Sequence, residues 1–499
     1  MKNTKNKKKD KSKMKKMAMS CILILGSIVS AQTQTVNLDE AIEIALHNNN
    51  TLKISQTSIE IAQAMYKQAM SANYPTLDLR VAAMRMDEDP TFDMMGTTTI
   101  DNRQTKAVYT SLGNAAQADG DLNTAGTYAA IVAATPDQTQ LPIDMEVKIM
   151  DRDSIISQVN MEYPLYVGGK ITAIVKQASL GKQIAKEGKR RTMNQVVYDV
   201  KRYYYAVVLM KQLKVLSHET LERMEFLLNL TSRLYQGGSM HVKKTDYLRS
   251  KLSVSFIKSL DEKIAQREAM AKAALVNTMG LQWQTEIDVA DEVLSKPVMD
   301  ETMNKLVQDA YKFNPDYVSL KLAIDVKKAK VDESKSDFYP HVGLTASAQN
   351  IYNSYDYGMV NDTNSKSWTI GVGATWSLFN GMRTSGEVEQ SKLEKLKLEQ
   401  TKVLLEEGLA LQVKDSFLNM QSAYKQFMIL EEAVDIAQEN RALNTRAYQE
   451  DMVETKDVIE SQLFESYTKG DFYRSEYDHA IARAKLDFII GIAMQEDKK

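Results

Sequence analysis

The sequence predicts a mainly α-helical, internally duplicated chain that also carries a transmembrane β part of four strands. Prolines are absent between Pro164 and Pro297 and again after Pro340, and both stretches are rich in Lys, Glu, Gln, Ala, Leu and Met. Such stretches are typical of long helices, which here are expected to pack as coiled coils. Apolar residues that alternate with small polar residues after Tyr74-Pro75 and Tyr339-Pro340 predict the strands.

The first 31 residues have the three parts of a signal peptide. Residues 1–16 contain nine Lys and one Asp, an apolar run of about 13 residues follows, and Val29-Ser30-Ala31 fits a cleavage site. This run is too short to span a bilayer, so we predict a signal peptide over residues 1–31. The alternative is an uncleaved anchor.

Charge and cysteine content narrow the possible functions of the mature chain. Removing residues 1–31 changes the formal net charge from −2 to −10, which leaves no basic surface that would indicate nucleic-acid binding. The only cysteine, Cys21, lies within the signal, so the mature chain has neither disulfides nor thiol chemistry. No later run of 18 apolar residues occurs, so any membrane crossing must use strands.

Residues recur in the same order at nearly constant shifts, which indicates an internal duplication. Tyr74-Pro75 recurs as Tyr339-Pro340 at a shift of 265, and the block from Leu165 to Gly168 recurs as Leu378 to Gly381 at 213. The shift falls to 211 near the repeat ends, where Gly280 corresponds to Gly491. Repeat one therefore carries 52 extra residues between its strands, and two more near the middle of its long helical region.

The shifts define the domain organisation. We predict repeat one over residues 32–280, a linker over 281–300, and repeat two over 301–499. Each repeat is expected to contain a helix of about 35 residues, two strands, a helix of about 65 residues, a tight turn and a shorter returning helix. The insertion of repeat one, about residues 84–153, is expected to face outside the cell. It could be a surface cap, a plug or a partly disordered segment.

The long helices carry a repeated apolar seam. Its positions follow one another at steps of four, four and three, the spacing of a buried helix stripe. The seam residues are Val196, Val200, Tyr204 and Val207 in repeat one, and Leu409, Val413, Phe417 and Met420 in repeat two.

The apolar side of the strands is predicted to face lipid, although alternation alone also fits a half-buried sheet of a soluble protein. Two features favour lipid: the opposite side carries Gly, Ser and Thr, and two of the three tryptophans lie in one short segment. Four strands cannot close a barrel, and open edges in lipid would leave backbone groups unpaired. An oligomer of at least three chains must therefore share them. The predicted lipid-facing positions are Leu77, Leu79, Val159, Met161, Tyr163, Val342, Leu344, Trp368, Val372 and Trp376.

The sequence gives no basis for an enzyme. Its five histidines are scattered without metal-ligand spacing, and neither a glycine-rich phosphate loop nor a Gly-x-Ser-x-Gly motif occurs. We predict no catalytic residue, no cofactor and no metal.

The turns after the two long helices complete an ordered set of motifs. They contain Tyr235-Gln236-Gly237-Gly238 in repeat one and Tyr448-Gln449 in repeat two, each followed by an Asp at the start of the returning helix. Together with the two Leu-aromatic-x-Gly motifs and the duplication, they resemble the TolC family of outer-membrane factors over essentially the whole mature chain.

The resemblance implies a homotrimer in the cell outer membrane of a Gram-negative-type bacterium. Such a trimer has a 12-stranded outer-membrane β-barrel in contact with lipid, continued into the periplasm by an α-barrel. It implies the outer-membrane channel of a tripartite efflux system, a passive exit duct for small molecules expelled by an inner-membrane transporter through a periplasmic adaptor (membrane fusion) protein. A type I protein secretion system is the alternative with the same fold. A secreted coiled-coil structural or adhesive protein is the alternative of another class.

The resemblance also implies roles for residues of the helix tips. By position, Asp457 and Glu460 match the acids that narrow the periplasmic aperture in some family members, whereas the residues alone fit ordinary surface acids. Asp451 stands where the family usually has Gly, and Asp246 lies eight rather than six residues after Gly238. The predicted adaptor-docking residues are Tyr235, Gly238, Asp246, Tyr448, Asp451 and Val453.

Overall fold

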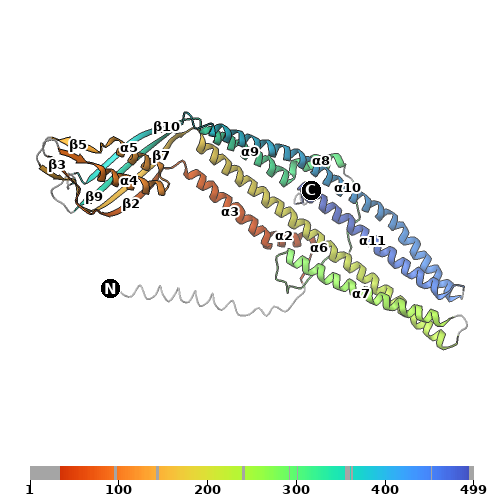
Figure 1. Ribbon diagram of the computed structural model, residues 1–499. Coiled ribbons are helices and arrows are strands. Elements are labelled where there is room, and N and C mark those ends of the chain that lie inside the picture. Colours follow the sequence, from red (N-terminus) through yellow and green to blue (C-terminus); the bar gives the residue numbers. More distant parts are fainter. Residues whose placement is uncertain are drawn as a thin grey trace, which may run out of the picture. The chain divides into compact units, whose positions relative to one another are not determined.

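The computed structural model describes residues 34–94, 98–141, 145–238, 242–291, 293–299, 302–353, 360, 364–450 and 452–493 (Figure 1). The predicted signal peptide lies outside the described residues. The chain divides into two compact units. The sheet unit comprises Ala64–Ser179 and Asp325–Lys395, and the helical unit comprises the chain up to Gln63, Leu180–Ile324 and the chain from Leu396.

The sheet unit is built on one antiparallel sheet to which each repeat contributes two neighbouring strands. Its strand order is β10-β9-β7-β2, so β2 and β10 are the edges. Strands β7 and β9 join the two repeats, with a bulge between Pro164 and Tyr166 where proline cannot donate to the ladder. The strands are β2 (Thr76–Arg85), β7 (Asp153–Val167), β9 (His341–Asn353) and β10 (Lys366–Thr375).

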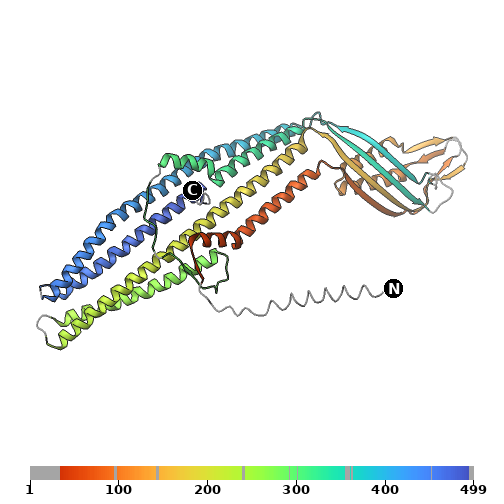
Figure 2. The same ribbon diagram turned by 180° about the vertical axis from the view of Figure 1, so that it is seen from behind.

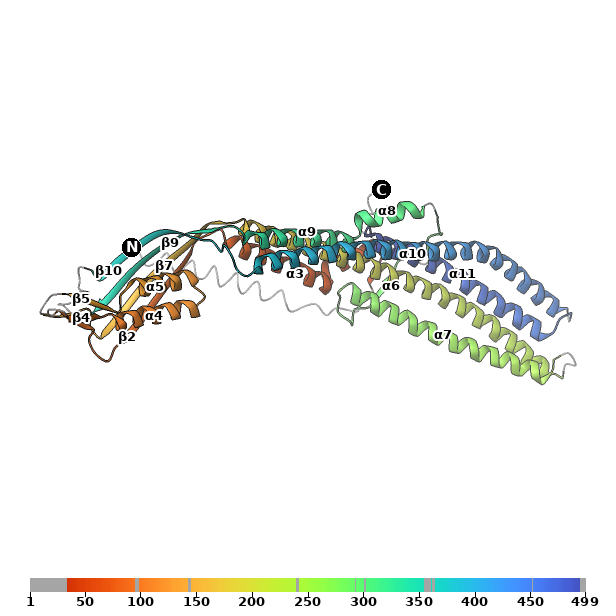
Figure 3. The same ribbon diagram turned by 45° about the horizontal axis from the view of Figure 1, so that its top comes forward.

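The insertion of repeat one is folded. Two short antiparallel ladders, β3 with β6 and β4 with β5, lead into a hairpin of two helices. Both helices lie beside the sheet in two views (Figure 1, Figure 3). The elements are β3 (Thr91–Met94), β4 (Thr98–Asp101), α4 (Arg103–Ala118), α5 (Leu122–Ala134), β5 (Gln138–Leu141) and β6 (Met145–Lys148).

The helical unit contains two helical hairpins, one from each repeat, whose long helices begin in the sheet unit. The long helices α6 (Lys170–Gln236) and α10 (Arg383–Gln449) each have 67 residues, close to the predicted 65. Their returning helices α7 (Lys244–Thr278) and α11 (Thr455–Ile490) run back alongside them (Figure 1, Figure 2). Strand β1 (Gln34–Val36) pairs in parallel with β8 (Ile287–Val289) of the predicted linker.

One prediction about the repeats is wrong: the first helix of each is broken in two. Repeat one has α2 (Leu38–Asn48) and α3 (Asn50–Ser71), and repeat two has α8 (Met303–Phe313) and α9 (Pro315–Ser336). The breaks fall at Asn49 and Asn314, whose ψ angles are 125° and 123°, outside the helical range.

The predicted seam forms the core of both hairpins. Val200, Tyr204 and Val207 are fully buried in one cluster with Leu275 of α7, and Val413 and Met420 are fully buried in a second with Leu486 of α11. Both clusters use the same positions of the two repeats, so the duplication extends to the packing. None of the helices among the described residues combines the length and the apolar character that crossing a membrane requires.

Candidate functional site

The turn between α10 and α11 holds the two acids predicted for an aperture. The backbone N–H of Glu454 donates to Asp457 Oδ2 at 3.0 Å, the reciprocal half of a capping box at the start of α11. The half-buried Asp457 carboxylate therefore caps its own helix, a role that the sequence analysis did not identify. Glu460 lies three residues later on the same helix face, exposed, with Lys456 Nζ 3.6 Å away.

The turn between α6 and α7 has the equivalent cap. Gly238, just after the end of α6, has a φ of 74°. This left-handed backbone conformation is unfavourable for residues with a side chain. The N–H of Lys243 donates to Asp246 Oδ2 at 2.9 Å, so Asp246 and Asp457 cap equivalent helices. The Tyr235 ring stacks on that of Tyr247, with centroids 6.0 Å apart.

The two tips lie together. Val458 and Ile459 of α11 share a buried cluster with residues of α6 and α7, and Tyr448 and Val453 pack against it. Lys243 Nζ of the first tip lies 3.9 Å from the Glu454 carboxylate of the second. The structure thus brings the predicted tip residues to one end of the helical unit, except Asp451, which lies outside the described residues.

The predicted lipid-facing residues of the strands share one face of the sheet. Leu79 pairs with Val159, which pairs through Ala348 with Trp368, and Tyr163 pairs through Leu344 with Val372. This face is open: Leu77 is 70% exposed and Trp368 is 76% exposed. A contiguous exposed apolar face of this kind marks an interaction with lipid or protein.

Trp376 departs from the prediction because it is not a strand residue. Strand β10 ends at Thr375, and the indole N–H of Trp376 donates to the carbonyl oxygen of Phe338 at 3.1 Å. This bond gives the indole N–H an acceptor at a point where the chain has left strand β10 and turns toward α10.

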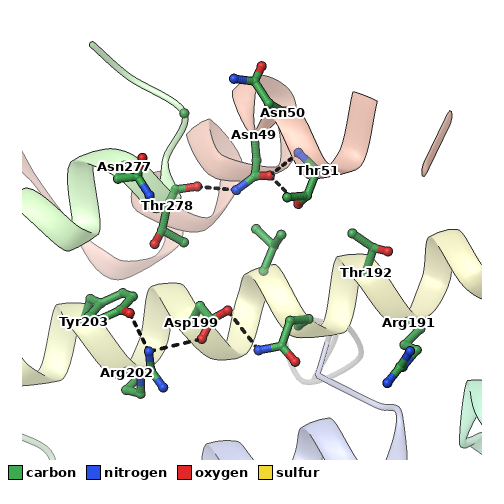
Figure 4. Close-up of a pocket in the computed structure, with 13 residues that line it drawn as sticks. Asn49, Asn50, Thr51, Arg191, Thr192, Asp199, Arg202, Tyr203, Asn277 and Thr278 are labelled. Atoms are coloured by element: carbon green, nitrogen blue, oxygen red, sulfur yellow. Dashed lines mark hydrogen bonds and ion pairs between the residues drawn. The ribbon is translucent and has the colours of Figure 1, made fainter. Parts of the chain in front are cut away.

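Each helix break is held by an asparagine that the sequence analysis did not assign to a site. Asn49 Nδ2 donates to the carbonyl oxygen of Thr278 at 2.7 Å, and Asn49 Oδ1 accepts from the N–H of Thr51 at 2.8 Å (Figure 4). Its side chain therefore caps α3 and binds the end of α7. Two sequence signals could have found this role: Asn49 and Asn314 correspond at the shift of 265, and Pro315 directly after Asn314 is typical of a helix start.

Repeat two uses the same arrangement. Asn314 Nδ2 donates to the carbonyl oxygen of Ile489 at 2.7 Å, and Asn314 Oδ1 accepts from the N–H of Tyr317 at 2.9 Å. Arg190 of repeat one adds a bond from Nη1 to the carbonyl oxygen of Phe313 at 2.6 Å. The two junctions tie each broken helix to the end of its returning helix.

A polar cavity of about 590 Å³ adjoins the junction of repeat one. Its two arginines are engaged. Arg202 pairs with Asp199 at 3.6 Å and lies over the Tyr203 ring (Figure 4). Arg191 pairs with Asp316 at 3.1 Å. Such internally paired groups are typical of a structural junction. Among the described residues, no group of three or more His, Cys, Asp or Glu side chains is placed to hold a metal ion.

Glu476 of α11 is a buried acid, and its protonation should make the free energy of unfolding depend on pH. It is 5% exposed, and burial raises the pKa of its carboxyl from 4.5 to about 7, with Gln212 and Lys296 opposing the rise and Glu431 adding to it. The folded protein then holds a proton that the unfolded chain releases above pH 4.5.

We therefore expect the stabilising contribution of protonated Glu476 to be lost as pH rises from about 4.5 to 7. The free energy of unfolding should fall by up to about 3 kcal/mol for this group. Glu476→Gln should remove that part of the pH dependence, measured by urea unfolding at pH 5 and pH 8. An unchanged pH dependence in Glu476→Gln would contradict the assignment, and Glu460→Gln, an exposed acid on the same helix, is the control.

Comparison with known proteins identifies relatives. Residues 306–491 match the family model described as "Outer membrane efflux protein". The "Solvent efflux pump outer membrane protein SrpC" of Pseudomonas putida is 22% identical over 358 residues, 71% of this chain. The chain spans 63% of the length of SrpC.

Solved structures share the fold. The outer membrane protein VceC from Vibrio cholerae superposes with a TM-score of 0.68 at 15% identity, covering 91% of this chain and 96% of VceC. The open state of the Neisseria gonorrhoeae MtrE outer membrane channel gives 0.69 at 13% identity, covering 95% of each chain. These comparisons confirm the predicted resemblance, the fold class and the outer-membrane localisation.

Proposed function

We propose that this chain, whose second repeat matches the outer membrane efflux protein family, is the outer-membrane channel subunit of a tripartite efflux system. It would act without catalysis, as a passive exit duct for small molecules. The observation that carries the proposal is the sheet: it has four strands, one open apolar face and two edges, in a chain that also supplies two 67-residue helices.

The sheet supports a homotrimer. Among the residues that the structure describes, edge strands β2 and β10 have no partner on their outer sides, a state that lipid does not tolerate. The four strands alternate in direction, so β10 of one copy can pair antiparallel with β2 of the next. Three copies then give 12 strands in a closed barrel with the apolar face toward lipid.

The helix tips are proposed as the docking site of a periplasmic adaptor. Tyr235, Gly238, Asp246, Tyr448 and Val453 lie at the end of the helical unit, and Asp451 belongs to the same turn. SrpC is named as the outer membrane protein of a solvent efflux pump. We propose that the inner-membrane transporter of such a system would act on this chain only through the adaptor.

Asp457 and Glu460 are proposed to line the periplasmic aperture. Three copies would present six carboxylates at one constriction, which would favour cations over anions. Because Asp457 also caps α11, alanine would disturb the turn as well as the charge. Asparagine keeps an acceptor for the Glu454 N–H and removes only the charge.

We expect Asp457→Asn combined with Glu460→Gln to lower the cation-to-anion permeability ratio by about threefold or more in planar bilayers, because six charges leave one constriction. Glu439→Gln, an exposed acid on α10 away from the tip, is the control and should leave the ratio unchanged. A ratio that stays unchanged in the double variant would show that these acids do not line the aperture.

Membrane fractionation tests the proposed function itself. The protein should be recovered in the outer-membrane fraction as a detergent-resistant oligomer of three chains. Recovery as a soluble species without that oligomer would refute the channel and favour the secreted coiled-coil alternative.

A further inference from the structure

We infer that the α4–α5 hairpin lies inside the barrel, where its three copies meet at the axis and fill the lumen of the resting channel, so that export would require them to move apart. This inference rests on the proposed trimeric channel, and it gives a location and a role to the insertion of repeat one. The partner of the hairpin is a second and a third copy of this chain.

The hairpin covers the polar face of the sheet, opposite the apolar face. Arg80 Nη2 on β2 pairs with Asp121 Oδ2 at 3.0 Å, and the Tyr128 hydroxyl donates to Gln158 Oε1 on β7 at 2.5 Å. Tyr128 is 6% exposed, and Ile156 of β7 is buried on the same face. If the apolar face meets lipid, these contacts place the hairpin on the lumen side.

The contacts extend along the height of the sheet. Near the outer end, α4 and the sheet enclose a small apolar cavity lined by Val108, Ile156 and Ile351, among others. At the hairpin turn, the Asp121 carboxyl lies beside the Glu162 carboxyl. In the ladder, Glu162 of β7 is opposite Thr76, the first residue of β2. Helix α4, about 24 Å long, thus matches the height of about 25 Å that ten residues of a tilted strand span.

The dimensions leave little free space in the lumen. Twelve strands about 4.8 Å apart and tilted by roughly 40° enclose a backbone cylinder about 25 Å across. A helix with its side chains is about 10 Å across, so one layer against the wall reaches nearly to the axis. Six helices about 10 Å across would overfill this cylinder, so they fit only at the closer spacing of about 8 Å that small side chains permit. The small residues Gly343, Ser347, Thr369, Gly371 and Gly373 on the inner face make room for them.

The surface of the hairpin that faces away from the sheet suits contact with copies rather than with water. Helix α5 has no charged residue, and α4 has only Arg103 and Lys106 in its first turn. The exposed residues Leu122, Gly126, Ala129 and Ala133 follow at steps of four, three and four on α5. This is the spacing of a coiled-coil seam, and its small side chains permit close approach at the axis.

Disulfide cross-linking in the full-length trimer tests the contact between copies. The mature chain has no native thiol if the signal containing Cys21 is removed. Oxidation of Leu122→Cys or Ala129→Cys should give covalent dimers in up to about two thirds of the chains, because three thiols at one axis form one bond. Glu88→Cys at the rim, where copies lie about 20 Å apart, is the control and should give none.

Excision of the hairpin tests whether it fills the lumen. Asn102 Nδ2 bonds the carbonyl oxygen of Pro136 at 2.5 Å, so a short Gly-Ser linker can replace Arg103–Thr135. A bulky impermeant maleimide, added outside cells, should label Thr369→Cys on the inner face about tenfold faster after excision. Trp368→Cys on the lipid face is the control and should stay unlabelled. This readout does not depend on the periplasmic aperture.

The outcomes separate the two proposals. A stable trimer without cross-links at either seam position, or with equal cross-linking of Glu88→Cys, would overturn the hairpin contact. Equal labelling of Thr369→Cys with and without the hairpin would overturn the filled lumen. Absence of any trimer in the outer membrane would instead refute the proposed function.

Discussion

Gly491→Ala should destabilise the protein by about 3 kcal/mol, although it adds a single methyl group. Gly491 ends α11 with φ 91°, a region that disfavours side chains. A Cβ there would overlap the carbonyl oxygen of Phe313 and lie 2.9 Å from Pro315 Cδ. Both atoms belong to the junction that Asn314 and Arg190 hold, so relief would require the α8–α9 break to open.

The measurement is urea unfolding of the solubilised protein, followed by helical circular dichroism. Gly408→Ala is the matched control: Gly408 lies inside α10, and apart from the adjacent backbone of that helix no atom lies within 4 Å of the added carbon. It should stabilise the protein by about 0.5–1 kcal/mol through helix propensity. If Gly491→Ala is as stable as the wild type, the junction is not a rigid part of the fold.

Arg441→Met should cost about 3 kcal/mol, because it leaves a buried carboxylate with one partner fewer. Glu465 of α11 is 1% exposed, and its carboxylate is paired with Arg441 of α10 and with Lys469 Nζ at 2.9 Å. Loss of the guanidinium would leave much of the desolvation cost of Glu465 without compensation.

A double-mutant cycle distinguishes this cost from lost packing. Glu465→Leu in the Arg441→Met background should recover most of the lost stability, since no buried charge then remains and Lys469 can reach water. The control is Lys258→Met, which breaks an exposed pair with Glu225 at 2.7 Å and should cost less than about 1 kcal/mol. Additive effects at Arg441 and Glu465 would contradict the buried pair.

The long helices, the repeat and the strand faces could be predicted because their signals are periodic. Val200, Tyr204 and Val207 lie on one helix stripe whether or not a partner is known, and burial follows from that spacing. Likewise, alternation places Leu77 and Leu79 on one face of β2, and the ladder only adds the register.

The helix breaks and the caps escaped prediction because they depend on contacts distant in sequence. Asn49 interrupts a helical pattern by binding Thr278, 229 residues away, and a helix-length run gives no sign of such a bond. Asp457 was assigned only an electrostatic role, although its spacing from Glu454 also fits a cap. The insertion has helical composition, but the face it covers is set by Arg80 and Gln158 of strands outside it.

The two tips differ in length, although the long helices match residue for residue. Seven residues separate α6 from α7, but only five separate α10 from α11. A ring of six hairpins from three chains would therefore alternate long and short turns, with pseudo-sixfold packing but only threefold symmetry at its rim. A docking protein with six identical subunits would then meet two kinds of neighbour, and its bound copies would have to adopt two conformations.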